Sequence, residues 1–193
     1  MKISCGVLAG GESRRMGRDK ALVDFDGRPL VTRVVDALSA WSDDVFVVAK
    51  SRADLEALGV RVYHDDSDAR TPLAGVLASL RAAAHPLVFV CATDMPHISP
   101  ALVALLASRA HGVDAVVPER DGRLEPLHAV WSAAAMDAID VRLGAGERAV
   151  HRVLDELNVI TVDELEWRAV DPEGASFTNL NTPDELAAAR CEI

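Results

Sequence analysis

The stretch Leu8 to Leu22 reads L-A-G-G-E-S-R-R-M-G-R-D-K-A-L and directly follows a short apolar run over residues 3–7. An apolar run that ends at two adjacent glycines predicts a buried strand that opens into a tight loop. Glycines let backbone N–H groups approach a ligand closely, and the charged residues beyond them are mostly basic: Arg14, Arg15, Arg18 and Lys20 against Glu12 and Asp19. This pattern predicts a loop that holds a phosphate chain. The structural alternative is a glycine turn whose basic residues face solvent.

Two better-known phosphate loops do not fit this stretch. Neither Gly10 nor Gly11 begins the G-x-x-x-x-G-K-[ST] spacing of the P-loop. Adjacent glycines also do not fit the G-x-G-x-x-G pattern of dinucleotide-binding folds. The loop is therefore a third kind of phosphate loop.

The loop resembles the signature of nucleotidyltransferases that join an NTP to a phosphorylated acceptor and release pyrophosphate, and it is most similar to that of the molybdenum cofactor guanylyltransferases. The resemblance runs from Met1 to about Arg190. It implies that nucleotide contacts come from the loop, and that two of its basic side chains offset negative charge on the α-phosphate and the leaving pyrophosphate. The matching residues are Leu8, Ala9, Gly10, Gly11, Ser13, Arg15, Met16, Gly17, Asp19 and Lys20. Of these, Leu8, Ala9, Gly10, Gly11 and Lys20 are expected to bind the nucleotide, and Arg15 and Lys20 to act in catalysis.

Length and composition favour one α/β domain. The chain has 193 residues, of which 50% are hydrophobic but only 4% aromatic, which suits helices packed on a parallel sheet better than a β-sandwich. We expect a single Rossmann-like domain over residues 1–193, with a mostly parallel, doubly wound sheet and helices on both faces. Residues 1–110 would form the nucleotide-binding half, and residues 111–193 the acceptor-binding half.

The expected elements alternate regularly along the chain. Strands are predicted over residues 3–7, 44–49, 87–92, 114–118 and 127–131. A further strand follows Gly59 and is expected to end near Tyr63. Helices are predicted over about 29–41, 51–58, 71–84, 99–110, 150–157 and 182–190.

Charge and cysteine usage exclude several classes of protein. The formal charge of -10 and a pI near 5.0 argue against general binding to nucleic acid or membranes. Cys5, Cys91 and Cys191 stand far apart without metal-like spacing, and we expect reduced core thiols. No signal-peptide pattern and no apolar run of membrane-spanning length is found, which predicts a cytoplasmic protein.

Asp94 is the strongest candidate for a metal ligand. It follows the most apolar predicted strand in the sequence Thr93-Asp94-Met95-Pro96. A carboxylate at the carboxyl end of a central parallel strand, together with phosphate oxygens, is a usual way of holding Mg²⁺. We therefore expect Mg²⁺, with Mn²⁺ as an alternative. The alternative without a metal is that Asp94 only caps the next turn.

An acidic segment, His64-Asp65-Asp66-Ser67-Asp68, follows the third predicted strand and is by default a solvated loop. Thr71-Pro72-Leu73-Ala74-Gly75 then opens a helix. In the family, an acidic residue after the third strand and a P-L-A-G helix start help to enclose the base. The resemblance thus implies that Asp66, Leu73 and Gly75 bind the nucleotide.

The second half supplies the acceptor candidates. A lone His128 on an apolar strand is more often a hydrogen-bonded core residue than a catalytic one, although Pro126-Leu127-His128 lies on the acceptor side in relatives. Arg148 belongs to a segment similar to one that faces the acceptor, but with Glu147 it would equally suit a surface pair. Asn179 and Asn181 alternate with apolar residues before a capped helix, where turn chemistry is the structural alternative. The family's F-x-N-x-N-T-P pattern is matched there and implies pterin or acceptor contact.

The resemblance implies transfer of GMP from GTP to molybdopterin carrying molybdenum, which gives the guanine dinucleotide cofactor and pyrophosphate. Implied partners are GTP, molybdenum-loaded molybdopterin, and other proteins of cofactor biosynthesis or molybdoenzyme-specific chaperones. One departure bears on the base: relatives are Asn-rich where this chain has Ala49-Lys50-Ser51-Arg52. The alternatives are therefore a molybdenum cofactor cytidylyltransferase or another sugar- or pterin-phosphate nucleotidyltransferase and, from another class, a non-catalytic nucleotide-binding protein that delivers the cofactor. The joint presence of Asp94 and Lys20 favours an enzyme.

Overall fold

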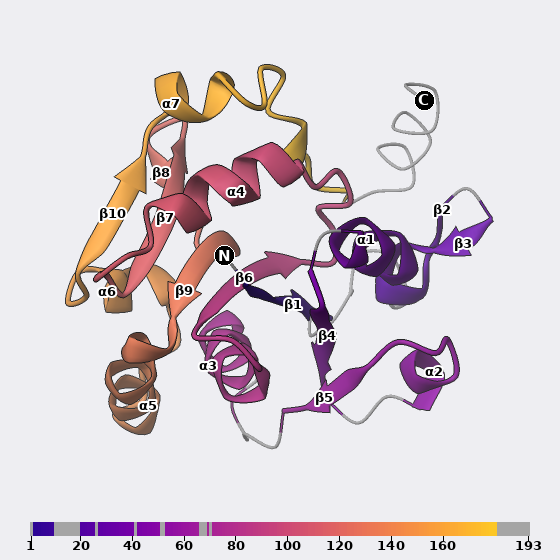
Figure 1. Cartoon of the computed structure of the whole chain (residues 1–193). Helices are drawn as coiled ribbons and strands as arrows, with labels where there is room; N and C mark the ends of the chain where they lie inside the picture. The colour runs from indigo at the N-terminus through magenta and orange to yellow at the C-terminus, as the bar shows by residue number, and fades with distance from the viewer. Residues whose placement is uncertain are drawn as a thin grey trace.

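A computed structural model describes residues 2–9, 20–25, 27–40, 42–50, 53–65, 69 and 71–180 (Figure 1). Several predictions fall outside these residues. They concern Gly10, Gly11, Arg15, Asp66, Asn181, Cys191, the helix over 182–190 and the side chain of Lys20.

The main sheet has the strand order β10-β7-β9-β6-β1-β4-β5. All neighbours pair in parallel except β9, which is antiparallel to both β6 and β7. The prediction of a mostly parallel α/β sheet is confirmed. The antiparallel direction of β9 was not predicted. The strands are β1 (Ser4–Leu8), β4 (Asp44–Ala49), β5 (Val62–His64), β6 (Leu87–Ala92), β7 (Ala115–Arg120), β9 (His128–Ser132) and β10 (Val159–Val162).

Three short strands stand outside this order. β2 (Asp24–Phe25) and β3 (Arg28–Pro29) form a two-stranded sheet of their own. β8 (Arg123–Leu124) pairs antiparallel with the end of β7. The turn between β7 and β8 is Asp121-Gly122, as predicted, and both residues have positive φ, 49° and 70°. Such a backbone is typical of tight hairpin turns and explains an Asp-Gly pair there.

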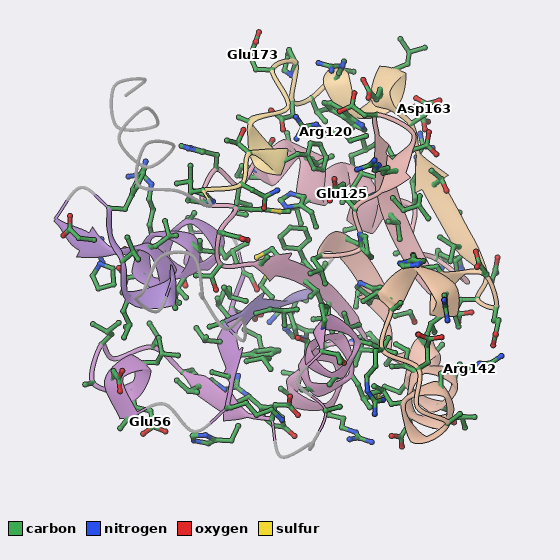
Figure 2. The ribbon with its side chains drawn as sticks, turned by 180° about the vertical axis from the view of Figure 1, so that it is seen from behind. Glu56, Arg120, Glu125, Arg142, Asp163 and Glu173 are labelled. Carbon is green, nitrogen blue, oxygen red and sulfur yellow. The ribbon has the colours of Figure 1, made fainter. Side chains whose placement is uncertain are left out.

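Helices cover both faces of the sheet. One face carries α1 (Leu30–Ser39), α4 (Pro100–Ser108) and α7 (Glu164–Arg168), and the other carries α3 (Pro72–Ala82), α5 (Met136–Gly144) and α6 (Val150–Leu154). Seen from behind, Arg142 of α5 and Asp163 before α7 lie on opposite sides of the sheet (Figure 2). The shorter elements are α2 (Ala53–Glu56), η1 (Lys20–Leu22), η2 (Ala133–Ala135) and η3 (Ala175–Phe177). Among the described residues, no helix has the length and apolar character needed to cross a membrane.

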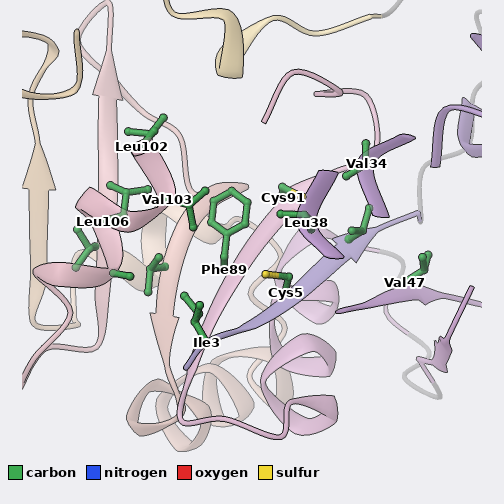
Figure 3. Close-up of a cluster of buried hydrophobic side chains, with 14 of the residues drawn as sticks. Ile3, Cys5, Val34, Leu38, Val47, Phe89, Cys91, Leu102, Val103 and Leu106 are labelled. Carbon is green, nitrogen blue, oxygen red and sulfur yellow. The ribbon is translucent and has the colours of Figure 1, made fainter. Parts of the chain in front are cut away.

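The core is divided between these two faces by the alternation of strand side chains. In β6, Phe89 and Cys91 face the α1 and α4 side, whereas Val88 and Val90 face the α3 side. Figure 3 shows the first cluster, in which Cys5 lies beside Phe89 and Cys91. Strands covered on both faces read as continuous apolar runs, which is why β6 is the most apolar stretch. Cys5 and Cys91 are buried and free, as expected of core thiols.

Side-chain caps are present at the starts of helices α3 and α4. The Thr71 hydroxyl accepts a hydrogen bond from the Ala74 amide at 3.3 Å, and the Ser99 hydroxyl accepts one from the Leu102 amide at 3.3 Å. Both helices then begin with proline, which has no N–H to leave unsatisfied at that position. Helices α3 and α6 end earlier than predicted, at Ala82 and at Leu154.

Among the elements of four or more residues, α5, β10 and α7 were not predicted. A signal for α7 was present, because Asp163 and Glu166 form a reciprocal capping box, with the Asp163 carboxylate accepting from the Glu166 amide at 2.9 Å. A signal for β10 was present too, because all four of its residues, V-I-T-V, are β-branched and three of them are apolar.

The opposite, amino edge of the sheet is held by buried Asp44. Its carboxylate accepts hydrogen bonds from the Ser4 hydroxyl at 2.5 Å and the Ala84 amide at 2.8 Å, and it pairs with Arg61. Burial alone would raise the pKa of Asp44, but these partners outweigh it and hold the pKa below its ordinary value. Asp44 therefore ties β1, β4 and the α3 to β6 connection together, away from the site.

Candidate active site

The carboxyl ends of β1, β4, β5, β6 and β7 lie along one edge of the sheet. The strand order reverses at β1, because β4 and β5 lie on one side of it and β6 on the other. In open parallel sheets, ligands bind outside the carboxyl ends at such a reversal. The antiparallel β9 contributes its first residue, His128, to the same edge, opposite Cys91.

The end of β1 is fixed by its neighbours. The Ala9 amide donates to the Val48 carbonyl at 3.0 Å, and the Leu8 carbonyl accepts from both the amide and the hydroxyl of Thr93, at 3.2 and 2.6 Å. These groups are therefore used within the sheet.

The ends of β4 and β5 bring Lys50 and Asp65 together. The Lys50 ammonium and the Asp65 carboxylate are 3.2 Å apart, and the Asp65 side chain is only 12% exposed. The Asp65 amide donates to the Ala49 carbonyl at 3.1 Å. Asp66 of the same acidic segment, which was predicted to bind the base, lies outside the described residues and stays a prediction, and Asp65 is the described carboxylate of this segment at the edge.

Leu73 and Gly75 lie in the first turn of α3, beside the end of β1. Leu73 is fully buried in the core, so its side chain packs against the sheet. A Cβ on Gly75 would lie 3.1 Å from Cδ1 of Leu8. The close approach that Gly75 allows is thus to Leu8 itself, and any contact of this turn with a ligand would be through its backbone.

Asp94 stands two residues beyond β6, at the reversal point. Its carbonyl accepts a hydrogen bond from the Leu180 amide at 2.8 Å, which brings the end of the described chain to this position. Thr93, buried at 4% exposure, anchors the preceding residue to β1. Thr93 belongs to the Thr93-Asp94-Met95-Pro96 motif, but no role was predicted for it.

The donor set at Asp94 fits a hard divalent cation. The described residues contain no group of three or more His, Cys, Asp or Glu side chains that could hold a metal by themselves. A single carboxylate that leaves the other positions to phosphate oxygens and water is how Mg²⁺ is commonly bound.

The predicted acceptor residues divide into two groups. Asn179 is exposed and directly precedes Leu180, so the structure brings it to Asp94. Arg148 is exposed, and its guanidinium donates to the carbonyls of Glu147 at 2.9 Å and Leu143 at 3.3 Å. The described hydrogen bonds of this side chain thus stay within the loop between α5 and α6.

His128 is completely buried, and both ring nitrogens have no hydrogen-bond partner among the described residues. The ring is in edge contact with Phe89 and Phe177, at centroid distances of 5.0 and 5.2 Å. Burial lowers the pKa of His128 to about 4, against a smaller opposing effect of Asp171. The expectation of a core position holds, but the expected hydrogen bond is absent from the described structure.

Comparison with known proteins agrees with this arrangement. Residues 5–161 match the MobA-like NTP transferase domain family. A molybdenum cofactor guanylyltransferase of Desulfosudis oleivorans is 36% identical over 189 residues, covering 97% of this chain and 94% of that protein. A probable molybdenum cofactor guanylyltransferase of Mycobacterium tuberculosis is 39% identical, covering 94% of this chain and 90% of its own.

A solved structure shows the same fold over nearly the whole length. The crystal structure of molybdopterin-guanine dinucleotide biosynthesis protein A from Archaeoglobus fulgidus has a TM-score of 0.86 and 30% identity, covering 98% of each chain. The domain match covers well over half of the sequence, and the relatives align almost end to end. The chain therefore belongs to the MobA-like NTP transferase family.

Proposed function

We propose that this chain transfers GMP from GTP to molybdenum-loaded molybdopterin, forming the guanine dinucleotide cofactor and pyrophosphate. The nearly full-length relatives named as molybdenum cofactor guanylyltransferases support this activity. The observation that carries it is the hydrogen bond from the Leu180 amide to the Asp94 carbonyl. It joins the predicted acceptor segment to the predicted metal ligand at the carboxyl edge of the sheet.

The reaction needs position and charge neutralisation more than a strong base. An anionic phosphate oxygen of the acceptor attacks the α-phosphorus of GTP, a new P–O bond forms, and the bond to the β-phosphate oxygen breaks to release pyrophosphate. Because the attacking oxygen is already ionised, orientation and electrostatic stabilisation account for most of the rate. In this proposal Asp94 would hold Mg²⁺ or Mn²⁺, which would neutralise phosphate charge. Arg15 and Lys20 would take up the remaining negative charge.

In this proposal the two halves of the chain bind different substrates. We assign residues 1–110 to the nucleotide and residues 111–193 to the acceptor, with Asn179 and Asn181 as the proposed acceptor contacts. The bond between Leu180 and Asp94 crosses this division. Variants of the two asparagines should therefore damage acceptor use while GTP binding is retained.

One assay tests the activity and names the base. α-Labelled GTP or CTP is incubated with Mg²⁺, molybdenum-loaded molybdopterin and the protein, and the labelled dinucleotide and pyrophosphate are separated. Asp94→Asn should abolish transfer while the protein stays folded, since asparagine keeps the size of the half-buried side chain but lacks the negative charge that holds a metal ion. Asp140→Asn is the matched control, because Asp140 is an exposed carboxylate on α5 paired with Arg81. Absence of transfer by the unaltered protein with either nucleotide would contradict the proposal.

The choice of guanine rests on a carboxylate reader. A carboxylate accepts from the N1 and N2 donors of guanine together, whereas cytosine offers one donor at N4. With CTP the carboxylate would be left unpaired, which would weaken binding by about 1–3 kcal/mol. This corresponds to a preference for GTP of roughly tenfold or more. Asp66→Asn and Asp65→Asn should be compared, because both belong to the acidic segment and Asp65 is placed at the edge. If neither changes the ratio of GTP to CTP use, the carboxylate does not read the base.

Partner proteins and location belong to the same proposal. We assign GTP and molybdenum-loaded molybdopterin as substrates, and cofactor biosynthesis proteins or molybdoenzyme-specific chaperones as recipients of the product. A cytoplasmic location is supported by the free thiols of Cys5 and Cys91, which are typical of reducing compartments. Cell fractionation with detection of the tagged chain tests the location.

A further inference from the structure

The last described residues form a short exposed stretch between two buried side chains. Phe177 and Leu180 are each 1% exposed, whereas Thr178 and Asn179 between them are exposed. We call Thr178 and Asn179 the bridge. A two-residue stretch that faces solvent has no packing of its own, so its position is set by what holds its two ends.

Both ends of the bridge are held by hydrogen bonds to distant residues. At one end the Leu180 amide donates to the Asp94 carbonyl at 2.8 Å. At the other end the Arg120 guanidinium donates to the Phe177 carbonyl at 2.8 Å and lies 6.0 Å from the centroid of the Phe177 ring. Figure 2 shows Arg120 at the end of β7, beside the η3 turn that contains Phe177.

The bridge crosses between strands that are not neighbours. Arg120 ends β7 and Asp94 follows β6, and β9 lies between these strands. Two strand spacings amount to about 10 Å, and three residues of extended chain also span about 10 Å. The stretch from Phe177 to Leu180 therefore has the length of the crossing, with one anchor on each side of β9.

We propose that Arg120 is a positioning residue that fixes the bridge beside Asp94 for the acceptor. This inference rests on the proposed function, in which Asn179 contacts the acceptor. A binding group that is already ordered costs less conformational entropy when its ligand arrives. Arg120 therefore acts on acceptor binding through the Phe177 carbonyl and touches neither substrate.

The chain offers a closely matched control in Arg168. Its guanidinium donates to the Pro172 carbonyl at 2.9 Å, lies 4.6 Å from the Trp167 ring and pairs with Glu164. It thus makes the same kinds of contact as Arg120, but its carbonyl partner lies before the η3 turn and away from the bridge. Arg120 likewise pairs with Asp121, at 3.6 Å, so Arg120→Met and Arg168→Met each remove one carbonyl bond, one ring contact and one ion pair, and Arg120→Lys keeps a donor.

The first measurement separates the two substrates. Arg120→Met should raise the KM for molybdenum-loaded molybdopterin about tenfold, the effect of losing one good hydrogen bond. The KM for GTP should stay within about twofold, Arg120→Lys should recover part of the loss, and Arg168→Met should change neither KM. Equal changes in both KM values, or no change in either, would overturn the inference.

The second measurement needs no turnover. In hydrogen exchange followed by mass spectrometry, peptides that cover residues 174–180 should exchange about tenfold faster in Arg120→Met than in the unaltered protein or Arg168→Met. If the unaltered protein transfers no nucleotide, the proposed function fails and this readout alone decides about Arg120. Unchanged exchange in Arg120→Met, or equal acceleration in Arg168→Met, would refute the positioning role.

Discussion

The burial of His128 predicts a pH dependence of stability that can be isolated by one substitution. The ring is completely buried with no described hydrogen-bond partner, and burial lowers its pKa from 6.5 to about 4, with Asp171 opposing. Between these values the unfolded chain binds a proton that the folded chain does not. The contribution of His128 to stability is therefore full above pH 6.5 and is lost as the pH falls toward 4.

The size of this effect follows from the pKa difference. A shift of one pKa unit corresponds to about 1.4 kcal/mol, so the full effect is about 3 kcal/mol. Between pH 7 and pH 5 the unfolded state gains most of this proton binding, and the free energy of unfolding should fall by about 2 kcal/mol through His128 alone. Other groups such as Asp44 also titrate in acid, but they are the same in a variant that lacks only the histidine.

The assay compares the unaltered protein with His128→Leu in urea unfolding at pH 7, 6 and 5. Leucine has a similar volume and no buried nitrogen, so removing unpaired polar atoms offsets the loss of the ring contacts at pH 7. The difference in free energy of unfolding between the two proteins should shift by about 2 kcal/mol in favour of the variant at pH 5. His151→Leu, on the exposed side of α6, serves as the control. A difference that stays constant from pH 7 to pH 5 would refute the burial of an unprotonated ring.

Three further substitutions test the packing that supports the site. Asp44→Ala should lower the free energy of unfolding by about 3 kcal/mol in urea titrations, because it leaves buried donors unpaired. Gly6→Ala would place a Cβ 2.6 Å from the Ser79 hydroxyl and should cost about 2 kcal/mol; Ser79→Gly in the same chain should restore part of this loss. Gly75→Ala meets the Leu8 side chain at 3.1 Å and should lower the melting temperature by several degrees, with no such effect in a Leu8→Ala background.

The parts of the fold that local chemistry determines could be predicted from the sequence. Pro72 after Thr71 and Pro100 after Ser99 mark helix starts, because a capping hydroxyl and a missing N–H are properties of adjacent residues. The apolar run of β6 identifies a strand covered on both faces. Asp94 stands two residues beyond the end of this strand. In a parallel sheet that position lies at the carboxyl ends of the strands, so its place could be predicted.

Other features depend on contacts between residues far apart in the sequence. β9 is a run of buried residues from His128 to Trp131, and such a run reads the same in a parallel and in an antiparallel strand. The bond from Arg120 to Phe177 joins positions 57 residues apart, and nothing in the neighbourhood of either residue indicates it. Asp66 stays a prediction because it lies outside the described residues, and two adjacent carboxylates in a loop are distinguished only by the turn that the backbone makes.

Phe177 connects the buried histidine with the proposed acceptor segment. Its carbonyl is held by Arg120, while its ring covers the ring of His128 at 5.2 Å. A displacement of the Phe177 ring would uncover one side of His128 and let its pKa rise toward the ordinary value, so that protonation of His128 and displacement of Phe177 would favour each other. The Phe177 carbonyl is also the anchor that Arg120 holds, so the same residue links the core around His128 to the end of the bridge.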